Sequence, residues 1–123
     1  MEISRKAPET AKGPAEWFTG DVWLDAVGQT GHVSVRSVHF APGTRTAWHA
    51  HPHGQVLHVT EGAGRVQARG AAREDVRAGD TVVSGPGEWH WHGAAPGAFM
   101  SHFAVSDGTT EWGEHVTDEE YRG

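Results

Sequence analysis

The 123-residue chain contains no cysteine. Disulfide bonds, thiolate nucleophiles and cysteine-ligated zinc are therefore excluded, and thiol content says nothing about the compartment in which the protein works. Long apolar runs are also missing. No stretch approaches the ~18 consecutive apolar residues of a membrane-spanning helix, and the N-terminal segment has no apolar core of signal-peptide length. We expect a cytoplasmic protein that does not enter a membrane.

Positive charge is scarce and scattered. Ten Lys and Arg residues stand against sixteen Asp and Glu residues, and the formal net charge is −6. A sequence-independent grip on phosphates requires clustered basic residues, so nucleic acids are poor candidates as partners. We expect the partner to be a small molecule.

Glycine, by contrast, is abundant. Seventeen glycines and six prolines punctuate short apolar runs, which favours strands and tight turns over helices. We predict a single all-β domain, a small antiparallel β-barrel or jelly roll of roughly eight strands. Residues 1–16 are polar and are interpreted as an N-terminal arm, and residues 17–123 as the folded domain. Near the C-terminus, Thr117 and Glu120 have the spacing of a capping box, which predicts about one turn of helix.

One expected strand, within residues 31–43, has an irregular alternation. Its apolar positions change parity between Val33 and Val35 on one side and Val38 and Phe40 on the other. Such a change indicates either a β-bulge or a strand that is apolar on both faces. The direction of Arg36 therefore stays open.

The ten histidines are clustered, with four between positions 49 and 58 and two more at 90 and 92. Residues two apart on a strand project to the same face, so His49 and His51 point together, as do His90 and His92. If the strands close into a barrel, the first pair, Gln55 and one histidine of the second pair can converge inside it. The alternative is that these are ordinary polar residues of surface strands.

Imidazole nitrogens and an amide oxygen suit a divalent cation of intermediate hardness, such as manganese, iron, cobalt, nickel or zinc. Calcium and magnesium prefer cages of oxygen ligands. Two other histidines are interpreted differently: His53 lies in the turn, at the rim of such a site, and His58 falls on the opposite strand face as a structural or solvent-facing residue.

The spacing resembles the two sequence motifs of the cupin family. Residues 43–62 match the first motif from Gly43 to Gly62, with Gln55 in the place of the usual glutamate. Residues 79–90 match the second motif, although Pro86 lies one position late and Ala94 replaces the usual asparagine. The resemblance implies a conical antiparallel β-barrel that binds one divalent metal ion. It implies manganese first, with iron, zinc, nickel or cobalt as alternatives, and it implies four ligands: His49, His51, Gln55 and His90.

A narrower resemblance, over residues 17–20, 40–55, 84–96, 101–102 and 114–121, is to small bacterial cupins with manganese-dependent hydroxynitrile lyase activity. It implies that His92 and His102 are pocket residues and candidates for the base. We expect a lyase that cleaves or forms small aromatic cyanohydrins, with the metal as Lewis acid. The alternatives are a metal-dependent dioxygenase or isomerase acting on a phenolic or keto substrate, and a non-catalytic small-molecule-binding protein.

Gln55 is interpreted as the residue that keeps the full charge of the cation available, because a neutral amide replaces a carboxylate. Trp48, Trp89 and Trp91 alternate with the ligands, so we expect them to face away from the metal and pack the outer side of the sheet or a subunit interface. The tryptophans and apolar barrel faces suggest a homodimer or homotetramer. The expected apolar lining of the substrate pocket consists of Val38, Phe40, Leu57, Val59, Ala94 and Met100.

Overall fold

The computed structural model describes all 123 residues and contains twelve strands and one short helix. The elements, in chain order, are β1 (Thr10–Lys12), β2 (Phe18–Thr19), β3 (Val22–Thr30), β4 (Val33–Phe40), β5 (Arg45–Thr46), β6 (His49–Ala50), β7 (Gln55–Ala68), β8 (Glu74–Arg77), β9 (Thr81–Ser84), β10 (His90–Ala94), β11 (Met100–Asp107), β12 (Glu111–Trp112) and α1 (Asp118–Arg122). The predicted all-β fold is confirmed. No helix is long and apolar enough to cross a membrane.

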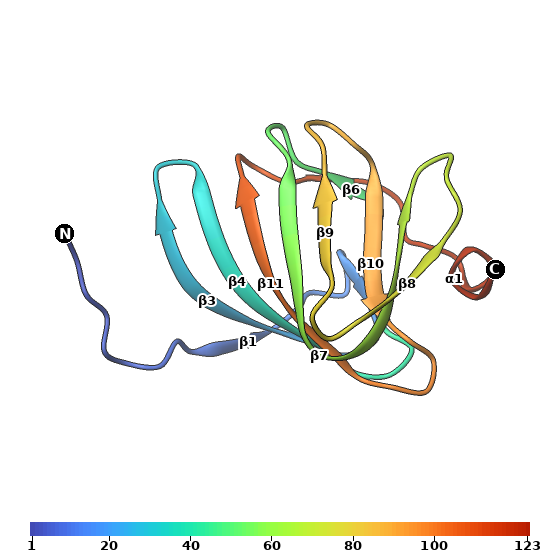
Figure 1. Ribbon diagram of the computed structural model, residues 1–123, viewed down its shortest axis with the longest axis horizontal. Coiled ribbons are helices and arrows are strands. Elements are labelled where there is room, and N and C mark those ends of the chain that lie inside the picture. Colours follow the sequence, from blue (N-terminus) through green and yellow to red (C-terminus); the bar gives the residue numbers. More distant parts are fainter.

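The 14-residue strand β7 organises the barrel. Its first half pairs with β11 and β9, and its second half pairs with β10 and β8. Through β7 the strands follow the order β1-β3-β4-β11-β7-β10-β5-β2, with every pairing antiparallel. The sheet curls so that its two ends face each other across an interior (Figure 1). The strand count exceeds the predicted eight because several strands have only two residues.

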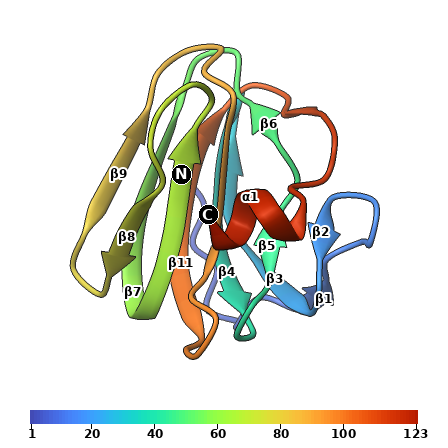
Figure 2. The ribbon, with the colours of Figure 1, turned by 90° about the vertical axis from the view of Figure 1, so that its right-hand side faces the viewer.

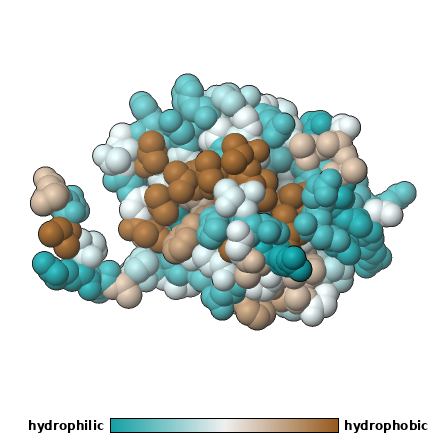
Figure 3. Space-filling model, in the orientation of Figure 1, coloured by the Kyte–Doolittle hydropathy of each residue, from teal (hydrophilic) through white to brown (hydrophobic).

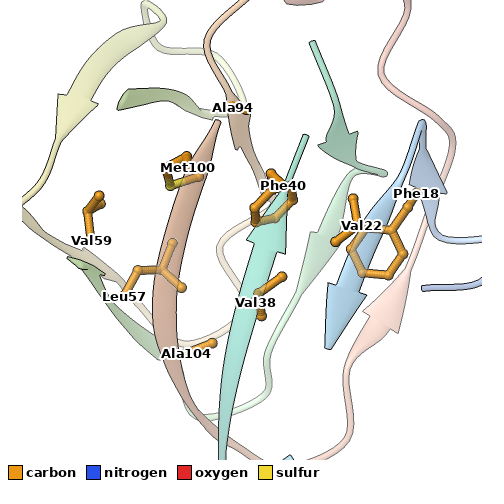
Figure 4. Packing of buried hydrophobic residues seen from close by; sticks show 9 residues of the cluster. All are labelled: Phe18, Val22, Val38, Phe40, Leu57, Val59, Ala94, Met100 and Ala104. Atoms are coloured by element: carbon orange, nitrogen blue, oxygen red, sulfur yellow. The ribbon is translucent and has the colours of Figure 1, made fainter. Parts of the chain in front are cut away.

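Nine buried apolar residues fill much of this interior (Figure 4). They come from six strands and contact one another across the barrel. Burial of each large side chain contributes roughly 1.5–3 kcal/mol of transfer free energy, so this cluster is the main support of the fold. The nine residues are Phe18, Val22, Val38, Phe40, Leu57, Val59, Ala94, Met100 and Ala104.

The pairing of strand β4 explains the change of parity that the sequence shows within residues 31–43. Its register with β11 is continuous from end to end, and the register irregularity lies in the neighbouring strand β3. Val38 and Phe40 are buried, whereas Val33 is exposed on the outer face. The strand is therefore apolar on both faces, the second of the two alternatives. Arg36 shares the parity of Val38 and faces the interior, where it lines a cavity.

A second apolar cluster lies on the outer side of β10. Trp48 and Trp91 are buried there against Val116 and Tyr121 of the C-terminal segment. Figure 2 shows α1 against this side of the barrel. The tryptophans thus face away from the interior, as the sequence predicts, but the chain's own C-terminus covers them.

The helix α1 has the predicted capping box. Thr117 accepts a hydrogen bond from the Glu120 backbone N–H, and the Glu120 carboxylate accepts one from the Thr117 backbone N–H. At the other end of the chain, residues 10–12 of the arm form β1 and pair with β3. Residues 1–9 are exposed and extend away from the barrel (Figure 1).

Candidate metal centre

Three histidines converge inside the barrel. His49 in β6 and His90 in β10 are direct register partners, and His51 follows two residues after His49. One ring nitrogen from each lies within 4.8 Å of the other two, and all three side chains are buried. The two H-x-H pairs of the sequence thus place three ligand atoms around one point.

Hydrogen bonds behind the rings define which nitrogen faces this point. His49 Nδ1 lies 2.9 Å from the carbonyl oxygen of Ala47, and His90 Nδ1 lies 2.9 Å from that of Glu88. A carbonyl oxygen only accepts, so both Nδ1 atoms carry the proton and both Nε2 atoms present a lone pair. His51 Nδ1 lies 3.3 Å from a threonine hydroxyl, while its Nε2 is buried without a partner. Backing of this kind is typical of metal-binding histidines.

Gln55, at the start of β7, completes the cluster. Its amide nitrogen donates to Ser106 Oγ at 3.0 Å, and its amide oxygen lies 3.0 Å from His90 Nε2. Because His90 carries its proton on Nδ1, two acceptor atoms face each other across this distance. Two lone pairs repel unless a cation lies between them, so the four residues fit a divalent metal ion.

A glycine turn brings Gln55 next to the histidines. Gly54 has φ +96°, a left-handed conformation, and a Cβ at this position would lie 2.8 Å from the Ser84 carbonyl oxygen. Both the conformation and the close approach exclude a side chain. The turn from His51 to Gln55 therefore depends on Gly54.

Burial keeps the cluster neutral. It is the main reason that the pKa of His49 lies well below its ordinary value and that the pKa of His51 falls to about 4, with the neighbouring charge of His90 as the second cause in both. The Arg36 guanidinium lowers the pKa of His51 further. The pKa of His90 is also lowered by burial. Neutral imidazole is the form that binds metal ions.

The two predicted bases, His92 and His102, lie next to the histidines that could hold a metal ion. His92 lines the cavity, and its Nδ1 is 3.0 Å from His102 Nε2. His102 is fully buried behind it and does not reach the cavity. His92 Nε2 is buried without a hydrogen-bond partner. Burial lowers the pKa of His92 well below its ordinary value and that of His102 to about 4, so both rings are neutral at pH 7.

The cluster opens on a cavity of about 490 Å³. Trp17 and Trp112 stack at its edge, with ring centroids 5.0 Å apart and an interplanar angle of 3°. The cavity is lined by Trp17, Phe18, Leu24, Gln29, Gly31, His32, Ser34, Arg36, Val38, Thr46, His49, His51, Gln55, His92, Ala104, Ser106, Gly108, Thr109, Thr110 and Trp112.

Of the six apolar residues expected in the pocket, only Val38 lies on the cavity wall. The other five belong to the hydrophobic core and do not line the cavity: Phe40, Leu57, Val59, Ala94 and Met100. Alternation along a strand selects the inner face but not the depth at which a side chain lies in the barrel.

Several cavity residues were not found from the sequence. Ser106 continues the alternation of His102 and Ala104, so strand parity could have found it. Trp17 and Trp112 lie in or next to strands of two residues, which are too short to show a period. The two remaining histidines of the first cluster, His53 and His58, are exposed and do not line the cavity.

The fold and the site together define a small antiparallel β-barrel protein with a buried cluster of three histidines and one amide that could hold a metal ion. The chain belongs to the cupin family, because the model of the cupin domain matches residues 36–106. The resemblance seen in the sequence is confirmed.

Two relatives match nearly the whole chain. An (R)-mandelonitrile lyase from Granulicella tundricola is 51% identical over 130 aligned positions, which cover 99% of each protein. The crystal structure of a cupin-like protein from Thermotoga maritima has a TM-score of 0.89 at 39% identity, over 98% of this chain and 96% of that one.

A polyketide cyclase, RemF from Streptomyces resistomycificus, has a TM-score of 0.71 at 16% identity, over 99% of this chain and 90% of that one. At this identity the likeness concerns the fold alone.

Proposed function

We propose that the protein is a metal-dependent lyase that cleaves and forms small aromatic cyanohydrins. The observation that carries the proposal is that His92, whose Nε2 has no hydrogen-bond partner, lines the same cavity as His49, His51 and Gln55. A 51%-identical relative that is a mandelonitrile lyase supports this choice.

Manganese is the metal of the proposal, held by His49, His51, Gln55 and His90. When bound, it would supply a Lewis-acidic charge that no anionic ligand reduces, suited to stabilising cyanide as it leaves or attacks. Iron, zinc, nickel and cobalt match the same nitrogen and oxygen donors, so the test includes each of them.

His92 moves the proton. With the shared proton on His92 Nδ1, donated to His102 Nε2, the His92 Nε2 lone pair is free to accept the hydroxyl proton of a cyanohydrin. As the O–H bond breaks, the oxygen electrons form the carbonyl, and the bond between carbon and cyanide breaks with its electron pair on cyanide. His92 then returns the proton to give hydrogen cyanide, and the reverse sequence forms the cyanohydrin.

His102 acts as a positioning residue. It is wholly buried, and its contact with His92 Nδ1 fixes the orientation of that ring. The ring of Phe40 packs against both histidines, with centroids 5.9 Å from His92 and 5.3 Å from His102. This packing excludes water from the far side of the pair.

The cavity wall suits an aromatic substrate. Phe18 packs edge-on against Trp112, with ring centroids 6.0 Å apart, and Trp17 stacks on the same indole. A benzene ring inserted here would meet aromatic faces and edges on one side. The cavity volume of about 490 Å³ is ample for a molecule of the size of mandelonitrile.

The test is an assay on metal-depleted protein reloaded separately with manganese, iron, zinc, nickel or cobalt. We expect benzaldehyde release from mandelonitrile to exceed the buffer rate with bound metal and to return to it after chelation. A variant with His49→Ala and His51→Ala serves as the metal-free control. If no metal accelerates benzaldehyde release above the buffer rate, the proposal is wrong. Oxygen uptake with iron and a catechol would favour the dioxygenase alternative instead.

We also propose that the protein forms a homodimer through the outer face of the sheet. Val35, Val105, Val56 and Val83 lie side by side across β4, β11, β7 and β9, and Val83 is 73% exposed. Figure 3 shows apolar side chains gathered in a band on this face. A two-fold axis would pack such a band against its own copy.

Light scattering tests the assembly. We expect a mass of at least twice 13.2 kDa, the value for one chain, and a lower mass for Val56→Lys. A monomer at every concentration would overturn this arrangement.

A further inference from the structure

The cavity differs in charge from the rest of the molecule. The chain carries sixteen Asp and Glu residues, yet none of the twenty residues that line the cavity is acidic. Arg36 is the one lysine or arginine on the wall. Arg36 is exposed to solvent where it lines the cavity. Because no acidic residue on the wall neutralises it, its charge favours an anionic ligand.

The Arg36 guanidinium has no partner within the protein. Its side chain makes no hydrogen bond or ion pair, whereas Arg45 binds Asp118 and Arg69 binds Glu114. Its register neighbours on β3 and β11 are Ala26 and Ala104, which offer neither charge nor bulk. The guanidinium is exposed, and no protein group competes with a ligand for its donors.

Arg36 lies near the candidate metal ligands but is not one of them. Ser34, Ser106 and Gln55 form one row across β4, β11 and β7, and Arg36 is two residues further along β4. With strands ~4.8 Å apart and ~3.4 Å per residue, the Cα atoms of Arg36 and Gln55 are about 12 Å apart along the sheet. The two residues therefore stand at separate positions on the wall of one cavity.

Other donors surround Arg36 on the wall. The hydroxyls of Ser34 and Ser106 and the amide of Gln29 line the same cavity. A carboxylate offers about four lone-pair sites, and a guanidinium can bind two of them in parallel. Hydroxyl and amide donors can satisfy the remainder.

We propose that the preferred substrate is an aromatic aldehyde, or its cyanohydrin, that carries a carboxylate on the ring, and that Arg36 binds this carboxylate. The ring then lies along the Trp17 and Trp112 side of the cavity, and the carbonyl carbon faces His92 and the metal cluster. The placement of the carbonyl carbon near His92 rests on the proposed lyase function, whereas the binding of the carboxylate by Arg36 does not.

The first test compares 4-formylbenzoate with 4-methylbenzaldehyde as acceptors of cyanide on the metal-loaded protein. The kcat/KM ratio of the two is measured in the wild type and in Arg36→Ala, so that their different intrinsic reactivities cancel. We expect the variant to lower the ratio about tenfold, the scale of a lost hydrogen bond between charged groups. Arg77→Ala, which removes an exposed arginine outside the cavity, is the matched control and should keep the wild-type ratio.

The second test measures binding without turnover. Quenching of tryptophan fluorescence gives the Kd of 4-formylbenzoate and of 4-formylbenzamide for the metal-loaded proteins. We expect Arg36→Ala to weaken carboxylate binding about tenfold and amide binding much less. An equal Kd for 4-formylbenzoate in the wild type and the variant would mean that the carboxylate binds elsewhere, for example on the metal, and would overturn the inference.

The two proposals can fail separately. If no aldehyde reacts but carboxylate affinity depends on Arg36, the lyase function fails and the anion site stands. If cyanohydrins form but neither the kcat/KM ratio nor the Kd responds to Arg36→Ala, the lyase function stands and the anion site is overturned.

Discussion

At the scale of single residues, Gln55 differs from the other candidate metal ligands because it offers an amide oxygen in place of an imidazole nitrogen. Its amide is held between Ser106 and His90, with the oxygen toward the histidine. In the proposed function, a neutral ligand at this position would leave the whole charge of a bound cation to act on the substrate.

The first prediction concerns this charge. Gln55→Glu should bind metal as tightly or more tightly, because a carboxylate attracts the cation. It should also slow cyanohydrin cleavage by about tenfold or more, because the added negative charge disfavours developing cyanide. Metal titration and steady-state assays measure the two effects. Unchanged or faster cleavage would remove this role from the glutamine.

The second prediction distinguishes the proposed role of His92 as proton acceptor from that of His102 as positioning residue. His92→Ala should lower kcat by about 10²-fold or more while the metal stays bound, because the proton acceptor is lost. His102→Ala should lower kcat less and change the shape of the pH–rate profile, because it alters the tautomer and pKa of His92. Metal loss in either variant would show that the residue belongs among the ligands.

Fixed spacings on strands predicted that His49 and His51 share a face and can meet one histidine of the second pair, and the cupin resemblance implied that this histidine is His90. The structure brings these three histidines together, and the Gln55 amide oxygen lies 3.0 Å from His90 Nε2. Arg36 was not assigned, because the parity change within residues 31–43 fits either a β-bulge or a strand that is apolar on both faces. Only the pairing of β4 with β11 and β3 shows that β4 has no bulge and that the irregularity lies in β3.

At the scale of elements, the turn between β6 and β7 brings Gln55 next to the buried histidines. Gly54 occupies a left-handed conformation there, against the Ser84 carbonyl. Gly70 has a similar positive φ of 83°, but a Cβ added to it would meet nothing within 4 Å. A comparison of alanine substitutions at the two glycines therefore separates the cost of backbone strain from the cost of a steric clash.

The third prediction uses this contrast. Gly70→Ala should cost about 1 kcal/mol of unfolding free energy through strain alone and leave metal affinity unchanged. Gly54→Ala should cost more, about 2–3 kcal/mol, and weaken metal binding, because the displaced turn moves Gln55. Chemical denaturation and metal titration of the two variants measure both effects. Equal metal affinity in the two variants would contradict the role of the turn.

The alternation of residues along a strand could not predict how deep in the barrel each inward-facing side chain lies. Leu57 and Met100 have the parity of cavity residues, but they lie in the core. Depth is set by the curl of the sheet and by the short strands β2 and β12, which add aromatic walls at one end. Those strands have two residues each, and their position depends on contacts far away in the sequence.

At the scale of the whole molecule, several buried histidines make stability depend on pH. Burial lowers the pKa of His51 and of His102 to about 4, whereas in the unfolded chain both have ordinary values near 6.5. Between these two values the unfolded state binds more protons than the folded state. The stabilisation is therefore complete above pH 6.5 and is lost as the pH falls toward 4.

The fourth prediction follows for the metal-free protein. Its unfolding free energy should be level above about pH 6.5 and fall at lower pH, with roughly 3 kcal/mol of the loss due to His102 alone. Urea denaturation at a series of pH values measures this. His102→Gln should flatten the curve, whereas a curve of unchanged slope would show that His102 does not titrate in this range.

The central claim is that one metal ion, held by three histidines and Gln55, enables the cavity to cleave cyanohydrins. Its most direct test is a titration of metal-free protein with manganese while benzaldehyde release from mandelonitrile is followed. The rate should rise linearly and stop at one equivalent of manganese per chain. A rate that is independent of manganese, or no release above the buffer rate at one bound equivalent, would contradict the claim.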